Sequence, residues 1–149
     1  MHSTTANRQN IVNGALNHYQ IVHFATHGIL DAAEPALSGL VLSSITEDGS
    51  PISQFLRSQD IASLDLRADL VVLSGCDTGS GQLVRGEGLI GLTRAFFYAG
   101  ADQVVSSLWK VPDRATTQLM GHFYREMLEN NLSPTQALRL ARLKVRDDP

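Results

Sequence analysis

The sequence contains one cysteine, Cys76, among its 149 residues. An intrachain disulfide is therefore excluded, and this cysteine usage is typical of chains that fold in a reducing compartment. No apolar run approaches the roughly 20 residues that a membrane-spanning helix needs, and the polar residues 1–10 lack the apolar core of a signal peptide. We therefore expect a cytoplasmic protein that has no membrane partner.

The sequence also lacks a large excess of charge of either sign. It has 12 Lys and Arg and 15 Asp and Glu, which gives a formal net charge of −3. Binding to phosphate backbones needs clustered basic residues, which argues against a direct nucleic-acid partner. Basic residues gather only near the end of the chain, where they suit the C-terminal end of a helix. The length and the hydrophobic content of 43% fit one globular domain over residues 1–149, with residues 1–10 expected to be loose.

Short apolar runs rich in β-branched residues alternate with segments of helical spacing. We expect strands at 20–25, 38–43, 69–74 and 104–109, and helices at 11–19, after Ser58, and at 89–99, 113–127 and 134–145. Asp113 is the expected N-cap of one helix, residues 133–136 match a capping box, and Gly100 suits the position after a helix end. The sequence DGSP at 48–51 indicates a tight turn within a small hairpin. Strands that alternate with helices after residue 69 predict an α/β fold with parallel connections.

A histidine and the cysteine each follow one of these predicted strands. His27 comes after the first strand and Cys76 after the third, 49 residues later. Parallel strands deliver their C-terminal residues to one sheet edge, and a thiol becomes nucleophilic when a base lies within hydrogen-bond reach. The two residues are therefore a candidate nucleophile and base. The alternatives are an inert buried thiol and a histidine that is bonded to the backbone.

Four motifs carry a resemblance to a known family: HFATHG at 23–28, LSGCDTG at 73–79, GEGL at 86–89 and SLWKVPD at 107–113. From about Tyr19 to Val145, the chain resembles the CHAT domain, a bacterial branch of the caspase, separase and gingipain-like cysteine peptidases. The resemblance implies a catalytic dyad of His27 and Cys76 and a three-layer α/β/α sandwich with a mostly parallel, caspase-like sheet. Since domains of this family begin earlier and continue further, it also implies a domain incomplete at one or both ends, part of a longer bacterial protein.

The chemistry expected of this dyad is acyl transfer. The backbone N–H groups of Gly28 and Cys76 are the expected oxyanion-hole donors, because glycine lets a substrate carbonyl approach closely. His23 is assigned to structural hydrogen bonding near the site. A zinc site on His23 and His27 would need the Glu and the helix of the zincin pattern, whereas Phe24 follows here. We therefore expect neither a metal nor a cofactor.

Four further residues are candidates for substrate binding: Asp77, Glu87, Trp109 and Asp113. Trp109 suits an apolar subsite wall, and Asp77 or Asp113 suits a basic residue before the scissile bond, as the resemblance implies. The alternatives are a packed tryptophan, helix caps, and for Glu87 a favourable position at a helix N-terminus. The pattern G-x-G-x-x-G at 86–91 would indicate a dinucleotide site only if a strand immediately preceded it, and the predicted strand ends more than ten residues earlier.

The resemblance predicts a cysteine endopeptidase that cleaves a protein or peptide substrate and is regulated by repeat or sensor domains outside this chain. Two alternatives stay open: a catalytically silent regulatory or scaffold module of the same fold, and a small-molecule thiol hydrolase. An uncovered sheet edge would also permit self-association.

Overall fold

A computed structural model describes residues 6–31, 34–45, 49–75, 85–107 and 111–147. Contacts within the chain divide it into two compact units, Met1–Lys110 and Val111–Pro149. Each unit is described below by itself.

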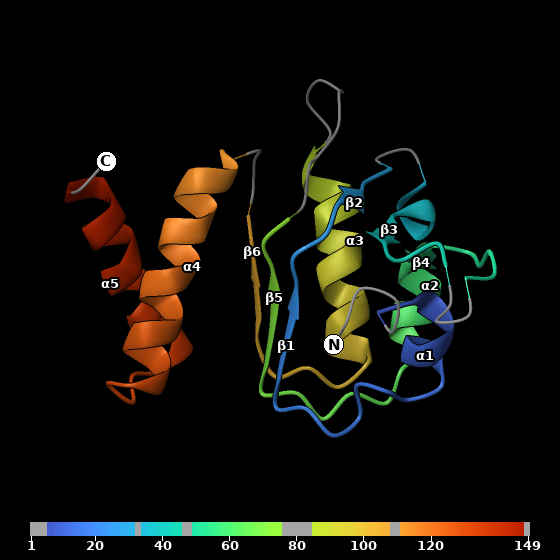
Figure 1. The fold of residues 1–149 in the computed structure, drawn as a ribbon, viewed down its shortest axis with the longest axis horizontal. Helices are drawn as coiled ribbons and strands as arrows, with labels where there is room; N and C mark the ends of the chain where they lie inside the picture. The colour runs from blue at the N-terminus through green and yellow to red at the C-terminus, as the bar shows by residue number, and fades with distance from the viewer. Residues whose placement is uncertain (1–5, 32–33, 46–48, 76–84, 108–110, 148–149) are drawn as a thin grey trace. The chain divides into compact units, whose positions relative to one another are not determined.

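A parallel sheet forms one side of the first unit (Figure 1). Its strands are β1 (Ile21–Phe24), β5 (Leu70–Leu73) and β6 (Val104–Ser106), in the order β1-β5-β6. Three predicted strands are thereby confirmed, although β6 ends at Ser106 and residues 108–110 lie outside the described part of the chain. All four residues of β5 are buried. This agrees with its continuous apolar sequence, which is typical of a central parallel strand that is covered on both faces. The expected α/β fold with a mostly parallel sheet is confirmed.

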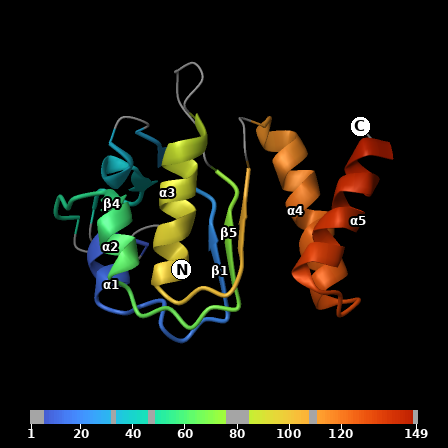
Figure 2. The same cartoon turned by 180° about the vertical axis from the view of Figure 1, so that it is seen from behind.

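Helix α3 (Arg85–Tyr98) packs on one face of this sheet. Phe24 of β1 meets Phe96 of α3 with ring centroids 5.5 Å apart, and Val71, Leu73 and Leu92 belong to the same core. In both views α3 lies between the parallel strands and the smaller elements α2 (Ser58–Ala62) and β4 (Phe55–Arg57) (Figures 1 and 2). Gly100 follows the helix end with φ +101°, as predicted, and a Cβ there would lie 2.2 Å from the Leu66 carbonyl oxygen.

A second sheet is antiparallel and has the order β2-β3-β4. It is formed by β2 (Gly28–Ile29), β3 (Gly39–Val41) and β4 (Phe55–Arg57), and the 3₁₀ helix η1 (Pro35–Leu37) precedes β3. Strands β3 and β4 form the predicted hairpin, which carries an additional bridge between Ile45 and Pro51. The two-residue strand β2 was not predicted, because two residues show no periodicity.

The N-terminal helix starts earlier than expected. Helix α1 spans Arg8–Val12, so the predictions of a loose segment through residue 10 and of a helix over 11–19 are both wrong in this region. The Asn7 side chain accepts a hydrogen bond from the Asn10 N–H at 2.9 Å and so caps the helix. Gly14, with φ +89°, follows its end. A short helix forms here as expected, but it begins at Ser58 and not after it: α2 spans Ser58–Ala62, and Arg57 is its N-cap.

The second unit contains the helices α4 (Asp113–Leu128) and α5 (Pro134–Asp147), which pack against each other. The predicted capping box is present, since Ser133 and Gln136 bond reciprocally at the start of α5. Asp113 is not the N-cap of α4: Pro112 occupies that position and Asp113 lies in the first turn. Lys144 of α5 pairs with the buried Glu126 of α4, and this hydrogen bond lowers the Glu126 pKa.

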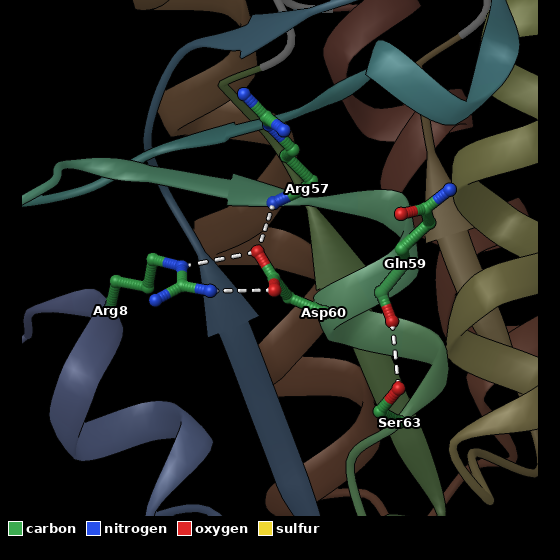
Figure 3. Close-up of polar contacts among 5 residues, drawn as sticks. All are labelled: Arg8, Arg57, Gln59, Asp60 and Ser63. Atoms are coloured by element: carbon green, nitrogen blue, oxygen red, sulfur yellow. Dashed lines mark hydrogen bonds and ion pairs between the residues drawn. The ribbon is translucent and has the colours of Figure 1, made fainter.

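An ion pair joins the N-terminal helix to α2 (Figure 3). Two nitrogens of the Arg8 guanidinium group donate to the Asp60 carboxylate: Nη2 lies 2.6 Å from Oδ1, and Nε lies 3.1 Å from Oδ2. The Arg57 N–H donates a third hydrogen bond to Asp60 at 3.0 Å. The hydrogen bond from Arg8 is the largest cause that holds the pKa of Asp60 below its usual value.

We predict that Asp60→Asn lowers the free energy of unfolding at pH 7 by roughly 1–2 kcal/mol, because the charge-assisted bonds to Arg8 are lost. A carboxylate with a lowered folded-state pKa stabilises the fold above the unfolded pKa of about 4, and this contribution disappears as the pH falls through the folded pKa. Urea unfolding at a series of pH values would therefore show the difference between wild type and variant shrinking in acid.

Asp65→Asn is the matched control, because Asp65 is 74% exposed and lies 4.0 Å from Arg67. Its effect is expected to stay within about 0.5 kcal/mol. Equal losses in the two variants would contradict a stabilising role for the Arg8–Asp60 pair.

Candidate active site

The candidate site begins where β1 and β5 end. Their register pairs Phe24 with Leu73, and the Ser74 N–H donates to the Phe24 carbonyl at 3.1 Å. One residue further, Gly75 lies so close to Thr26 that an added Cβ would stand 2.5 Å from the Thr26 carbonyl oxygen and 2.7 Å from its nitrogen. Only glycine permits this approach. The two chain segments therefore remain side by side beyond the strands.

His27 is held from the other side by the small antiparallel sheet. Its carbonyl accepts a hydrogen bond from the Val41 N–H at 2.8 Å, and the Thr26 hydroxyl donates to the Val41 carbonyl. The His27 side chain is exposed. Its backbone is thus fixed while its imidazole faces solvent, which is the arrangement that a general base needs.

The next residue, Gly28, is buried and pairs with Leu40. Because the Val41 N–H bonds to His27, the register makes Gly28–Leu40 a non-hydrogen-bonded pair of the antiparallel ladder. The Gly28 N–H therefore points away from β3. An N–H in this orientation, next to a candidate base, is suited to stabilise a developing oxyanion.

A side-chain bond also links the two strand ends. His23 Nε2 lies 2.7 Å from the Ser74 hydroxyl oxygen, and desolvation lowers the pKa of His23, so the imidazole is neutral at pH 7. This agrees with the expectation that His23 has a structural role near the site. Ser74 was not singled out from the sequence, since only the register places its side chain on the same face of the sheet as His23.

Several predicted site residues cannot be placed. Cys76, Asp77 and Trp109 lie outside the described residues, and so does the side chain of Glu87 in the first turn of α3. Asp113 begins α4 in the second compact unit. The structure thus brings His27 and Gly28 together with the segment that ends at Gly75, one residue before the predicted nucleophile.

The described part of the chain contains neither a candidate metal site nor a membrane-spanning helix. Among those residues, no three His, Cys, Asp or Glu side chains are grouped so that they could hold a metal ion. Within the same residues, no helix has the length and apolarity to cross a membrane.

Comparison with known proteins defines the class. The model of the CHAT domain matches residues 2–149, and the chain belongs to this family. It is 35% identical over 156 residues to tetratricopeptide repeat protein 28 from Homo sapiens and, with the same identity, to the Mus musculus protein of that name. Each match covers 85% of this chain but 6% of the relative. Both relatives are mammalian, whereas the resemblance of the motifs pointed to a bacterial branch.

We predict that Gly75→Ala destabilises the protein by roughly 1–3 kcal/mol, because the added methyl group must displace the Thr26 backbone. Gly121→Ala in α4 is the matched control: nothing lies within 4 Å of its added Cβ, and alanine should stabilise the helix by about 0.5–1 kcal/mol. Urea unfolding of both variants gives the comparison. A Gly75→Ala protein as stable as wild type would contradict the close approach of the two segments.

Proposed function

We propose that the chain is a caspase-like cysteine endopeptidase domain in which Cys76 is the nucleophile and His27 is the general acid and base. One observation carries the proposal: Gly75 lies against the Thr26 backbone. Cys76 and His27 are the next residues in the chain, and consecutive Cα atoms are about 3.8 Å apart. This closeness of the preceding residues supports the pairing of the Cys76 thiol with the His27 imidazole.

The proposed reaction is acyl transfer to the thiol and then to water. His27 removes the Cys76 proton, the thiolate attacks the peptide carbonyl, and the Gly28 and Cys76 N–H groups stabilise the tetrahedral oxyanion. Protonated His27 then donates its proton to the departing amine, which leaves a thioester. His27 next deprotonates a water molecule that attacks the thioester, and the released thiol regains the proton.

The same proposal covers substrate choice and regulation. Asp77, Glu87, Trp109 and Asp113 are proposed to contribute to substrate binding, with an acidic side chain attracting a basic residue before the scissile bond. The relatives are named for tetratricopeptide repeats, and the chain spans about 6% of their length. These names support a parent protein whose repeat domains regulate the peptidase. The single cysteine supports the proposal of a cytoplasmic location.

A second candidate function is a non-catalytic interaction module of the same fold. It is favoured by the names of the relatives, which refer to repeats and not to a peptidase. The two candidates differ in whether Cys76 is activated by His27.

We predict that iodoacetamide alkylates Cys76 rapidly at pH 7, and that His27→Ala slows this reaction roughly tenfold, because a thiol without a paired base is only a few per cent thiolate at this pH. The rate should be followed from pH 5 to 9 by mass spectrometry. His18→Ala is the matched control because His18 is also exposed; its rate should equal that of wild type.

Alkylation at the rate of a free thiol and independent of His27 would contradict the peptidase proposal and leave the interaction module. Hydrolysis of an internally quenched peptide, abolished by Cys76→Ala, would identify the reaction as peptide cleavage.

A further inference from the structure

The antiparallel sheet has an inner and an outer face, and the candidate base lies on the outer one. On the inner face Leu40 and Leu56 are fully buried, and Gly28 is buried as well. Because successive residues of a strand point to opposite faces, the alternate residues form the outer face of this sheet. These are His27, Ile29, Val41, Phe55 and Arg57. His27 is included because its carbonyl continues the β2–β3 pairing.

Ile29 is the most exposed apolar residue of the outer face. It stands two positions from His27 on the same side of the strand, roughly 7 Å along it, and its side chain is 54% exposed. The position opposite Ile29 is Gly39, where a Cβ would lie 2.3 Å from the Leu56 carbonyl oxygen. The β3 position beside Ile29 therefore carries no side chain, and an apolar surface is exposed directly beside the candidate base.

A cation stands across the sheet from Ile29. Gly39 pairs with Arg57 on its other side, so Ile29, Gly39 and Arg57 form one row. The Arg57 side chain is exposed and extends away from Asp60 in Figure 3. Asp60 is already bound by Arg8 and by the Arg57 N–H, so the Arg57 guanidinium group is not needed for that pair. The neighbouring row contains the partly buried Val41 and Phe55.

We propose that the outer face of the β2–β4 sheet binds the substrate segment next to the scissile bond, with an apolar side chain against Ile29 and an acidic side chain at Arg57. The inference rests on the proposed peptidase function and adds a substrate class to it. Continuity with His27 argues for substrate as the occupant, and the charge of Arg57 argues for an acidic residue.

The spacing of the two substrate residues follows from the sheet. Two inter-strand distances of about 4.8 Å separate Ile29 from Arg57, and an extended peptide advances about 3.3 Å per residue. Alternate residues of an extended peptide face the same side, so a peptide that crosses the strands presents both side chains to this face when the apolar and acidic residues are two positions apart. The long Arg57 side chain then spans the remaining distance.

The test uses internally quenched peptides that contain this apolar–acidic pair, or glycine or glutamine in place of either member. We expect Ile29→Thr to lower kcat/KM about tenfold for peptides with the apolar residue and to leave the glycine peptides unchanged. Arg57→Gln should act in the same way on the acidic residue alone. Val12→Thr and Arg67→Gln are matched controls, since Val12 in α1 is 45% exposed and the Arg67 side chain is 80% exposed, both outside this face. Neither control should change the selectivity.

Hydrolysis with selectivity that neither Ile29→Thr nor Arg57→Gln alters would overturn the proposal while leaving the peptidase function intact. If no peptide is cleaved and alkylation of Cys76 is independent of His27, the peptidase function fails instead. Binding of the same peptides to the Cys76→Ala protein, measured by fluorescence anisotropy, then tests whether the outer face binds peptide. Weaker binding after Ile29→Thr would support the proposed peptide site, and equal binding would overturn it. Self-association that Ile29→Thr abolishes, in sedimentation experiments, would assign the face to a second copy of the chain and also overturn it.

Discussion

The parallel register of β1 and β5 is the constraint on which the candidate site depends. Pairing of Ile21 with Leu70 fixes the pairing of every later position, through Phe24 with Leu73. A shift by one residue would turn the apolar side chains of β1 to the opposite face and would also separate Thr26 from Gly75. The same register therefore satisfies both the packing of the core and the close approach of Gly75 to Thr26.

Burial explains why this register is specific. On β1, Val22 and Phe24 are buried while His23 between them is exposed. Only one orientation of the strand therefore places its apolar side chains in the core. Phe24 packs against Phe96 of α3, whereas β5 is buried along its whole length. His23 on the opposite side of β1 and Ser74, which directly follows β5, are then available for the bond between them. Hydrophobic patterning thus determines where the polar groups of the site lie.

The sequence could predict elements whose signals are local. The strands that precede His27 and Cys76, the capping box at Ser133 and the glycine after α3 each follow from a few adjacent residues, and all are present. Contacts between distant residues could not be predicted. Arg8 and Asp60 are 52 positions apart, and His23 and Ser74 are 51 apart, so nothing in the sequence indicates either pair before the fold is known. Asp113 was misplaced because Pro112, with its extended backbone, takes the capping position.

The segment that carries His27 connects the two sheets of the first unit. It leaves the parallel sheet at Phe24 and enters the antiparallel sheet at Gly28, so three residues span the junction. Thr26 lies against Gly75 on one side and bonds to Val41 on the other. Because both sheets hold this short connection, a change in the packing of β3 and β4 would reach His27 without touching the parallel sheet. The antiparallel sheet consequently helps to position the candidate base. A peptide bound to its outer face would therefore contact the same sheet that holds the connection carrying His27.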